Sequence, residues 1–416
     1  MIDALARRLA ELLLGRRPAG TLVVREGRHS RRCGAGLPLV EVTVHAPRAW
    51  RMLLRGSRGL AEAYGQGLWD CRDLVGAIAL AARNAAWLDR LRRALAWPLA
   101  PLRLARALLR PSTRRRRRLE IAAHYDLGSE LFARMLDPTM SYSCAVFERE
   151  GMTLEDAQLA KLERVCEKLR LTGSDHVLEI GAGWGAFAIH AAATRGCRVT
   201  AATISPEQHE HAVERVRRAG LSQRVTVLLR DYSDLRGRYD KLVSIEMIEA
   251  VGWRGFGPFL SACSRLLAAD GAMLLQAITI DERLYELEKA SRSFVNTVIF
   301  PGGCLPSLRL IARRLDRMTD LRMLDVEDLT DDYVRTIDCW RRSFAASEPA
   351  LAARGYDERF RRLWRLYLAY CQAGFQERRI RDFQLLLAKP GWCSRPPRAQ
   401  ATRAEPAPDA SALLEI

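Results

Sequence analysis

A glycine-rich turn after an apolar run is the first feature of the sequence that could do chemistry. Residues 177–185 read VLEIGAGWG, with glycines at Gly181, Gly183 and Gly185. Glycines after a strand let the backbone approach a ligand without a clash from Cβ. A dinucleotide site would show GxGxxG and a later acid, but position 186 is alanine and the next strand ends in AATIS. The loop therefore indicates either a nucleoside cofactor other than a dinucleotide or a tight structural turn.

The segments around this loop alternate between predicted strands and helices. Strands are predicted at HVLEI, CRVTAAT, RVTVLL, YDKLVSIE and GAMLLQAITI within residues 174–280, with helices between the first three and between the last two. This alternation favours an α/β fold with a parallel, doubly wound sheet. SPEQ opens one helix, because Ser205 can cap it, Pro206 suits its first turn and Gln208 can reach back. DFQLLLAKP, at residues 382–390, is predicted to be a late strand that completes the sheet.

Composition shifts predict four parts in the chain. Residues 1–80 are predicted to form a small α+β domain, with strands at TLVV and LVEVTVHA and two helices joined by a glycine turn. Residues 81–120 form a basic amphipathic linker in which Leu, Ala and Trp alternate with arginines and prolines. Residues 121–392 carry the main α/β domain, and the Pro/Ala-rich residues 393–416 are expected to be a disordered tail.

Charge and cysteine content limit the partners and the compartment. The 416 residues carry a formal net charge of +17, which predicts nucleic acid, an anionic membrane surface or an acidic substrate as partner. Ten cysteines without a CxxC pair argue against a disulfide framework or a zinc site and favour reduced thiols in a cytosolic protein. No uninterrupted apolar stretch of about 20 residues occurs, so no segment is expected to span a bilayer.

Six segments, taken in order, resemble one enzyme family. They are HYDLGSELFARMLDPTMSYSCAVFE, VLEIGAGWG, VTAATISPEQ, EMIEAVG, IFPGGCLPS and YLAYCQAGF. Together they resemble the cyclopropane-fatty-acyl-phospholipid synthase family, which includes mycolic acid cyclopropane synthases and related fatty-acyl methyltransferases. The resemblance covers about residues 20–390. It implies a class I S-adenosylmethionine-dependent methyltransferase fold for residues 121–392, with insertions that bind the acyl chain.

The resemblance implies S-adenosylmethionine as cofactor and assigns residues to it. These residues are Tyr142, Ser143, Gly181, Gly183, Thr203, Gln208, Asp231 and Tyr232. Asp231 and Tyr232 would flank the adenine. Two alternatives stay open, because Gln208 could only cap its helix and Tyr232 could only pack in the core.

The family's reaction, as the resemblance implies it, needs an unusual site. The alkene of an acyl chain attacks the sulfonium methyl group and leaves a carbocation on the chain. Loss of a proton from the new methyl closes a cyclopropane ring, whereas a hydride shift followed by proton loss leaves a methylene branch. The site must therefore exclude water, surround a cation with weakly nucleophilic walls and place one base.

The resemblance implies a bound bicarbonate ion as that base and no metal. Its holders map onto Cys144, Glu249, Tyr333 and, through the backbone, Ile278. Many members read LLHTI where this chain reads LLQAI, so Gln276 replaces a histidine that could carry charge near pH 7. Gln276 can still donate to bicarbonate, and the choice between ring and branch stays open. Without the family, Cys144 would be an ordinary buried thiol.

The implied substrate is an unsaturated acyl chain of a membrane phospholipid. We therefore expect a cytoplasmic protein associated with the inner face of the membrane. Leu and Trp of the linker could enter an anionic surface while Arg114–Arg118 meet phosphates, although a solvated linker is the alternative. The oligomeric state is not decided by the sequence, and a homodimer is compatible with it.

Two rival classes remain. An RNA methyltransferase would share the fold, and its RNA would bind the arginines. The sequence contains no interleaved aromatic platform and no NPPY-type or cysteine-based motif, so no nucleic-acid partner is expected. A non-catalytic lipid-binding protein with a relic cofactor site is the other rival. The intact SYSC, GAGWG and Glu249 argue against it, whereas the replaced histidine favours it.

Overall fold

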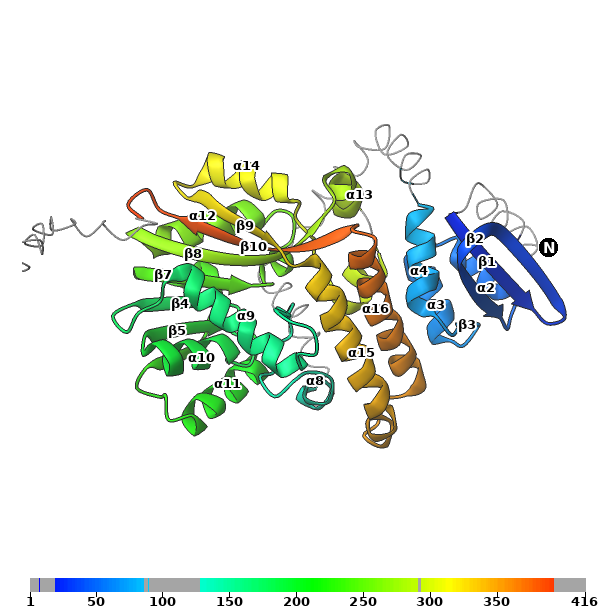
Figure 1. Ribbon diagram of the computed structural model, residues 1–416, viewed down its shortest axis with the longest axis horizontal. Coiled ribbons are helices and arrows are strands. Elements are labelled where there is room, and N and C mark those ends of the chain that lie inside the picture. Colours follow the sequence, from blue (N-terminus) through cyan, green and yellow to red (C-terminus); the bar gives the residue numbers. More distant parts are fainter. Residues whose placement is uncertain (1–6, 8–18, 86–88, 90–127, 291–292, 393–416) are drawn as a thin grey trace, which may run out of the picture.

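The computed structural model describes residues 7, 19–85, 89, 128–290 and 293–392, which form a large α/β unit and a smaller N-terminal unit (Figure 1). The predicted linker falls mostly outside the described residues, and so do Arg114–Arg118 and the predicted tail at 393–416. None of the described helices is both long and apolar enough to cross a membrane.

A seven-stranded sheet in the order β6-β5-β4-β7-β8-β10-β9 forms the centre of the large unit. Its strands are β4 (His176–Ile180), β5 (Arg198–Thr203), β6 (Val225–Leu229), β7 (Tyr239–Ile245), β8 (Leu267–Ile280), β9 (Arg322–Asp328) and β10 (Ile380–Ala388). The first five run parallel, and β10 runs antiparallel between β8 and β9. The predicted α/β fold with a doubly wound sheet is confirmed, with a mixed sheet where a parallel one was expected.

Strand β9 was not predicted from the sequence. It lies at the sheet edge, and most of its residues are exposed. Glu327 binds Arg164 and Lys168 of a neighbouring helix, so charged side chains cover this edge. Charges of this kind protect an edge strand from further pairing but remove the apolar alternation by which a strand is recognised.

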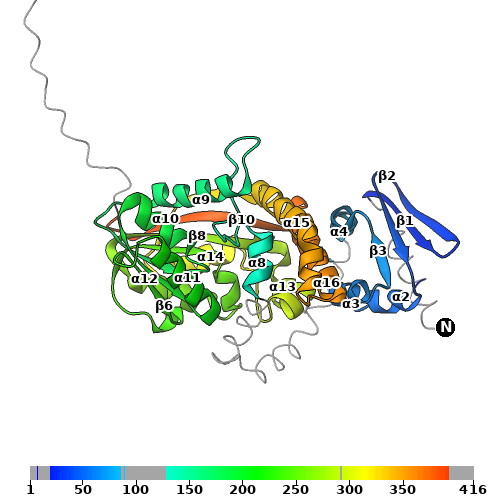
Figure 2. The same cartoon turned by 90° about the horizontal axis from the view of Figure 1, so that it is seen from below.

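Helices cover both faces of the sheet (Figures 1 and 2). They are α8 (Ser129–Met135), α9 (Leu154–Leu169), α10 (Ala186–Arg195), α11 (Pro206–Arg218), α12 (Phe256–Leu266), α13 (Tyr285–Ala290), α14 (Leu308–Met318), α15 (Thr330–Ala353) and α16 (Glu358–Gln376). Successive residues of a strand point to opposite faces. Val177 thus packs with α9 and α10, while Leu178 packs with α12 and α14.

The predicted start of α11 is confirmed at the cap. The Ser205 side chain accepts a hydrogen bond from the Gln208 amide at 3.2 Å, and Pro206 lies in the first turn. The Gln208 side chain does not reach back to the cap as predicted. Its oxygen instead accepts a hydrogen bond from Thr203 Oγ1 at 2.9 Å, which ties the start of the helix to the end of β5.

The N-terminal unit contains an antiparallel sheet of β1 (Ala19–Glu26), β2 (His29–Val44) and β3 (Trp69–Cys71), with α2 (Arg48–Leu53), α3 (Ser57–Gly65) and α4 (Leu74–Arg83). The two predicted strands and the two helices joined by a turn at Gly56 are present. Helix α4 continues across residue 80, where a boundary was predicted.

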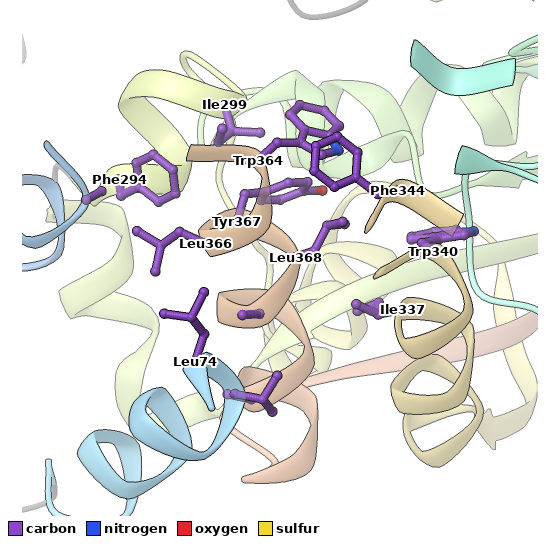
Figure 3. Packing of buried hydrophobic residues seen from close by; sticks show 14 of the residues in the cluster. Leu74, Phe294, Ile299, Ile337, Trp340, Phe344, Trp364, Leu366, Tyr367 and Leu368 are labelled. Carbon is purple, nitrogen blue, oxygen red and sulfur yellow. The ribbon is translucent and has the colours of Figure 1, made fainter. Parts of the chain in front are cut away.

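This unit packs against α16. The Arg362 side chain donates to the Tyr64 carbonyl at 2.6 Å and to Asp70 at 2.7 Å. Figure 3 shows apolar side chains of α4, α15 and α16 meeting in one buried cluster, among them Leu74 and Leu366. Helices α15 and α16 therefore stand between the N-terminal unit and the large sheet (Figure 2).

Candidate active site

A pocket opens at the carboxyl ends of the parallel strands. The chain passes from β4 through β5 to β6 on one side, and β7 lies on the other side of β4. Ligands of doubly wound sheets bind at such a reversal of strand order. Gly181 follows β4, Thr203 ends β5 and Glu246 follows β7, and all three line this pocket, which holds about 1220 Å³ of empty space including its open part.

All eight residues predicted to contact the cofactor line this one pocket. They are Tyr142, Ser143, Gly181, Gly183, Thr203, Gln208, Asp231 and Tyr232. They come from five separate places in the chain, so the fold brings together what the sequence separates. Their contacts with S-adenosylmethionine stay a prediction.

The glycine loop leaves room for a ligand. Gly181 has a φ of 93°, and a Cβ added there would lie 2.9 Å from the Met247 side chain. Gly183 has a φ of 50°, and a Cβ added there would meet no atom within 4 Å. Both positions favour glycine, and the open space beside Gly183 fits the close backbone approach of a nucleoside cofactor.

Two further predicted residues are held in place around the pocket. The Asp231 carboxylate accepts hydrogen bonds from the Ser233 amide at 3.0 Å and the Ser233 hydroxyl at 2.6 Å. The Tyr232 ring meets Phe259 edge-on with centroids 5.3 Å apart. The structure therefore gives Tyr232 a packing role whether or not it also contacts the cofactor.

The sequence reasoning missed Lys161 and Glu179, which also line the pocket. Lys161 Nζ donates to Ser143 Oγ at 3.0 Å. Burial raises the pKa of Glu179 to about 8, although Lys161 opposes this rise, and burial lowers the pKa of Lys161. Glu179 was visible as the acid inside VLEIGAGWG, whereas Lys161 lies on a distant helix and carried no signal.

The pocket lining contains a third missed residue of greater consequence, Glu246. Three hydrogen bonds converge on the Glu246 carboxylate. The Cys144 amide and Gln276 Nε2 donate to Oε1 at 2.7 and 3.0 Å, and the Tyr333 hydroxyl donates to Oε2 at 2.5 Å. Three of the five residues predicted to be catalytic thus meet at a glutamate that was quoted within EMIEAVG but not singled out.

The other two predicted catalytic residues bind one another. The Ile278 amide donates to Glu249 Oε1 at 2.6 Å, and Glu249 Oε2 is buried without a hydrogen-bond partner among the described residues. Burial, and then the charge of Glu246, raise the pKa of Glu249 to about 8. The raised pKa favours the protonated form of the Glu249 carboxyl near neutral pH.

Cys144 faces this cluster through its backbone, not through its thiol. The residue is fully buried, and its Sγ lies 3.2 Å from the Ala145 carbonyl oxygen and 3.5 Å from that of Leu329. Burial raises the pKa of the thiol well above its ordinary value. Burial thereby disfavours a nucleophilic thiolate, and it is the amide of Cys144 that donates to the cluster.

Gln276 joins two carboxylates. Its Nε2 donates to Asp382 Oδ2 at 2.8 Å as well as to Glu246, and its Oε1 accepts from Gln384 Nε2 at 3.1 Å. Burial and the charges of Glu246 and Glu249 raise the pKa of Asp382 well above its ordinary value. A carboxamide has two N–H donors on one nitrogen, whereas a neutral histidine has one in total, so glutamine suits this position.

An aromatic wall borders the cluster. Tyr333 stacks on Phe375 at 4.3 Å between centroids and meets Trp340 edge-on at 6.0 Å. Trp340 in turn lies 5.1 Å from Tyr142, whose hydroxyl lies 2.7 Å from that of Tyr367. Aromatic faces exclude water and attract a cation without attacking it. The wall is continuous from the pocket residue Tyr142 to the Glu246 partner Tyr333.

The segment EKASRSFVNTVIFPGG, which the resemblance predicts to help line the acyl chain, reaches this wall through Phe300. Phe300 meets Tyr367 with centroids 6.0 Å apart, and Phe294 and Ile299 are buried in the same apolar cluster (Figure 3). The Phe294 amide donates to Ser57 Oγ at 3.2 Å, which links this segment to the N-terminal unit. Its contact with an acyl chain stays a prediction.

Comparisons with known proteins agree with this geometry. Residues 112–385 match the mycolic acid cyclopropane synthetase family. The chain is 37% identical over 363 residues to the tuberculostearic acid methyltransferase UfaA1 of Mycobacterium tuberculosis, covering 84% of this chain and 83% of that protein. It is also 37% identical over 345 residues to the cyclopropane-fatty-acyl-phospholipid synthase of Escherichia coli strain K12, covering 82% and 85%.

A solved structure of a mycolic acid cyclopropane synthase has a similar fold. The mycolic acid cyclopropane synthase CmaA1, crystallised in complex with SAH and CTAB, aligns with a TM-score of 0.61 at 31% identity over 65% of this chain and 98% of that one. Fold and pocket thus define a class I S-adenosylmethionine-dependent methyltransferase. The chain belongs to the mycolic acid cyclopropane synthetase family and is a methyltransferase that acts on unsaturated fatty acyl chains.

Proposed function

We propose that the protein transfers a methyl group to the cis double bond of an unsaturated phospholipid acyl chain and closes a cyclopropane ring. One observation carries the proposal. Glu246 lines the pocket together with the eight predicted cofactor residues and also accepts hydrogen bonds from the catalytic cluster, so the two halves of the site share a wall. A methylene- or methyl-branched product is the second candidate, supported by Gln276 in place of a histidine and by the similarity to a tuberculostearic acid methyltransferase.

The residues of this chain suit such a reaction. Bound S-adenosylmethionine would supply a methyl group on a sulfonium sulfur, with the glycine loop and Asp231 holding it. The aromatic wall of Tyr142, Trp340 and Tyr333 would keep water from the acyl cation and stabilise its charge. The double bond of the substrate is the nucleophile, so the inert thiol of Cys144 is no obstacle.

A bicarbonate ion does not fit the cluster as it stands. Of the groups predicted to hold it, the Cys144 amide, Gln276 and Tyr333 already donate to Glu246. The Ile278 amide already donates to Glu249. No step of the mechanism is therefore routed through bicarbonate.

The setting of the substrate is a further part of the proposal. A phospholipid tail lies in a bilayer, so the protein would act in the cytoplasm as a peripheral protein on the anionic inner face of the membrane. The predicted docking element, Arg114–Arg118, lies outside the described residues. A homodimer and the absence of a nucleic-acid partner stay predictions.

Mass spectrometry of lipids from cells that express the protein tests the function. We expect unsaturated phospholipid chains to gain the mass of one CH₂ unit, and NMR of the purified lipid then separates a ring from a branch. Unchanged lipids, together with saturable binding of S-adenosylmethionine by the purified protein, would instead support the non-catalytic lipid-binding alternative. Retention on RNA but not on anionic vesicles would support an RNA methyltransferase.

A further inference from the structure

We propose that Glu246 is the base of this reaction and occupies the place that the family resemblance assigns to a bicarbonate ion. The inference rests on the proposed function, because it names the group that takes the proton from the acyl cation. Three lines of observation lead to it, and each comes from a different property of the residue.

The first is the convergence of donors. A bicarbonate ion and a glutamate side chain both present a planar pair of oxygens to their surroundings. The Cys144 amide, Gln276 Nε2 and the Tyr333 hydroxyl lie 2.5–3.0 Å from the Glu246 oxygens, and all three belong to residues predicted to contact bicarbonate. The Glu246 carboxylate therefore accepts the hydrogen bonds that the resemblance assigns to a bicarbonate ion.

The second is the backbone of Glu246. Its φ is 48°, in the left-handed region that favours glycine and that few other side chains adopt. Strained backbone of this kind persists only where the surroundings hold it, and it occurs preferentially at functional sites. Here the Glu246 amide donates to the Gln276 carbonyl at 2.9 Å, so the unusual conformation aims the carboxylate at its three donors.

The third is the position of Glu246 between the cofactor pocket and the aromatic wall. Glu246 lines the same pocket as Gly181 and Tyr142. Its partner Tyr333 belongs to the aromatic wall through Trp340 and Phe375. A cation that forms on a chain between the cofactor and this wall would lie beside this carboxylate.

The charge state of the cluster suits a base. Burial raises the pKa of Glu246 to about 7, against the hydrogen bonds from Tyr333 and the Cys144 amide and the charge of Lys161. Of the other acids that face it, Glu249 has a pKa raised to about 8, and Asp382 has a pKa raised well above its ordinary value. The three donors that converge on Glu246 favour its ionised form, and a general base works best near the ambient pH.

The proton transfer balances in either product channel. For ring closure, a C–H bond of the new methyl group breaks and its electron pair forms the last C–C bond of the cyclopropane. For a branch, a hydride shift comes first, and the electron pair of the broken C–H bond forms a C=C bond. In both channels the proton passes to the Glu246 carboxylate, which becomes a neutral acid and returns the proton to solvent after the product leaves.

Turnover of purified protein on unsaturated phospholipid vesicles, with and without dissolved bicarbonate, tests the assignment. The Glu246→Gly variant leaves a cavity among the three donors and suits the local φ of 48°. We expect wild-type turnover to change less than about twofold on removal of bicarbonate. We expect Glu246→Gly to lose about 10²–10⁴-fold in kcat, the usual contribution of a general base. Added bicarbonate or formate should restore its turnover at least about tenfold.

A matched control separates chemistry from backbone strain. Arg170 has a φ of 52°, is exposed, and lies at the end of α9 outside the pocket. The Arg170→Gly variant thus makes the same backbone change elsewhere, and we expect neither a loss of turnover nor an effect of bicarbonate. The Glu246→Gln variant fills the space with an uncharged group, so we expect a similar loss without rescue, and unchanged S-adenosylmethionine affinity.

The outcomes distinguish this inference from the proposed function. Loss of wild-type turnover on removal of bicarbonate, or full turnover of Glu246→Gly without it, would overturn the role of Glu246. If wild-type protein modifies no lipid, the proposed function fails, and NMR of isotopically labelled bicarbonate still tests the site. Binding to Glu246→Gly but not to wild type supports the replacement, and saturable binding to wild type contradicts it.

Discussion

The cofactor half and the catalytic half of the site are assembled in different ways. The cofactor half depends on short local motifs, with Gly181 and Gly183 on one turn and Thr203 and Gln208 bound to each other five positions apart. The catalytic half depends on distant segments, because Cys144 and Tyr333 both donate to Glu246 from positions 102 and 87 residues away. Local motifs position backbone for a cofactor, whereas a buried carboxylate needs donors from several elements to remain in place.

The two halves should respond differently to mutation, and after Glu246 the largest effect is expected at Glu249. Its carboxyl lies in the catalytic cluster and is coupled electrostatically to Glu246, so Glu249→Gln removes a group that can exchange a proton. We expect kcat to fall by at least about 100-fold, the lower range for acid–base groups. S-adenosylmethionine affinity, measured by calorimetry, should change little. Unchanged turnover would remove Glu249 from the mechanism.

The reverse pattern is expected at Asp231. It lies in the cofactor half, where Ser233 holds its carboxylate. The Asp231→Asn variant is expected to lose a charged hydrogen bond to the cofactor, at a cost of about 1.5–3 kcal/mol, or roughly 10–150-fold in affinity. Calorimetry should show this loss, while kcat at saturating cofactor stays within about threefold. A large fall in kcat with unchanged affinity would show that the halves are not separable.

The role of Tyr333 in the catalytic half can be tested through the pH dependence of kcat. Its hydroxyl donates to Glu246 and lowers the pKa of that carboxyl, so Tyr333→Phe should raise it. A base must be ionised, and the acidic limb of the kcat–pH profile should therefore move to higher pH, by about one unit. Loss of activity without any shift of the acidic limb would assign Tyr333 to packing alone.

The last prediction concerns stability. Burial raises the pKa of Glu249 from 4.5 in the unfolded chain to about 8, so the folded state retains a proton that the unfolded state loses. The raised pKa stabilises the folded state at acidic pH. This stabilisation is lost as the pH rises from 4.5 to about 8. The free energy of unfolding should therefore fall with pH in wild type relative to Glu249→Gln, by at most about 1.4 kcal/mol per unit. Denaturant titrations at pH 5 and pH 8 would measure it, and parallel pH profiles would contradict it.

The sequence by itself determined the class of the protein. The apolar strands and the glycine turn depend on neighbours in the chain, and β4, β5 and β7 lie where their patterns predicted them. The same holds for Ser205, whose cap bonds an amide three residues away. Motifs that act over a few residues can be recognised without the fold.

Only the tertiary structure decided which group occupies the catalytic cluster. Glu246 has no local pattern, and its donors lie 102, 30 and 87 positions away along the chain. The unexpected edge strand β9 depends on its pairing with β10. The Gln208 side chain likewise bonds Thr203 on β5 and not the cap of its own helix. The physical reason is that the charge of a buried carboxylate depends on every donor and acid around it, and folding alone brings those groups together.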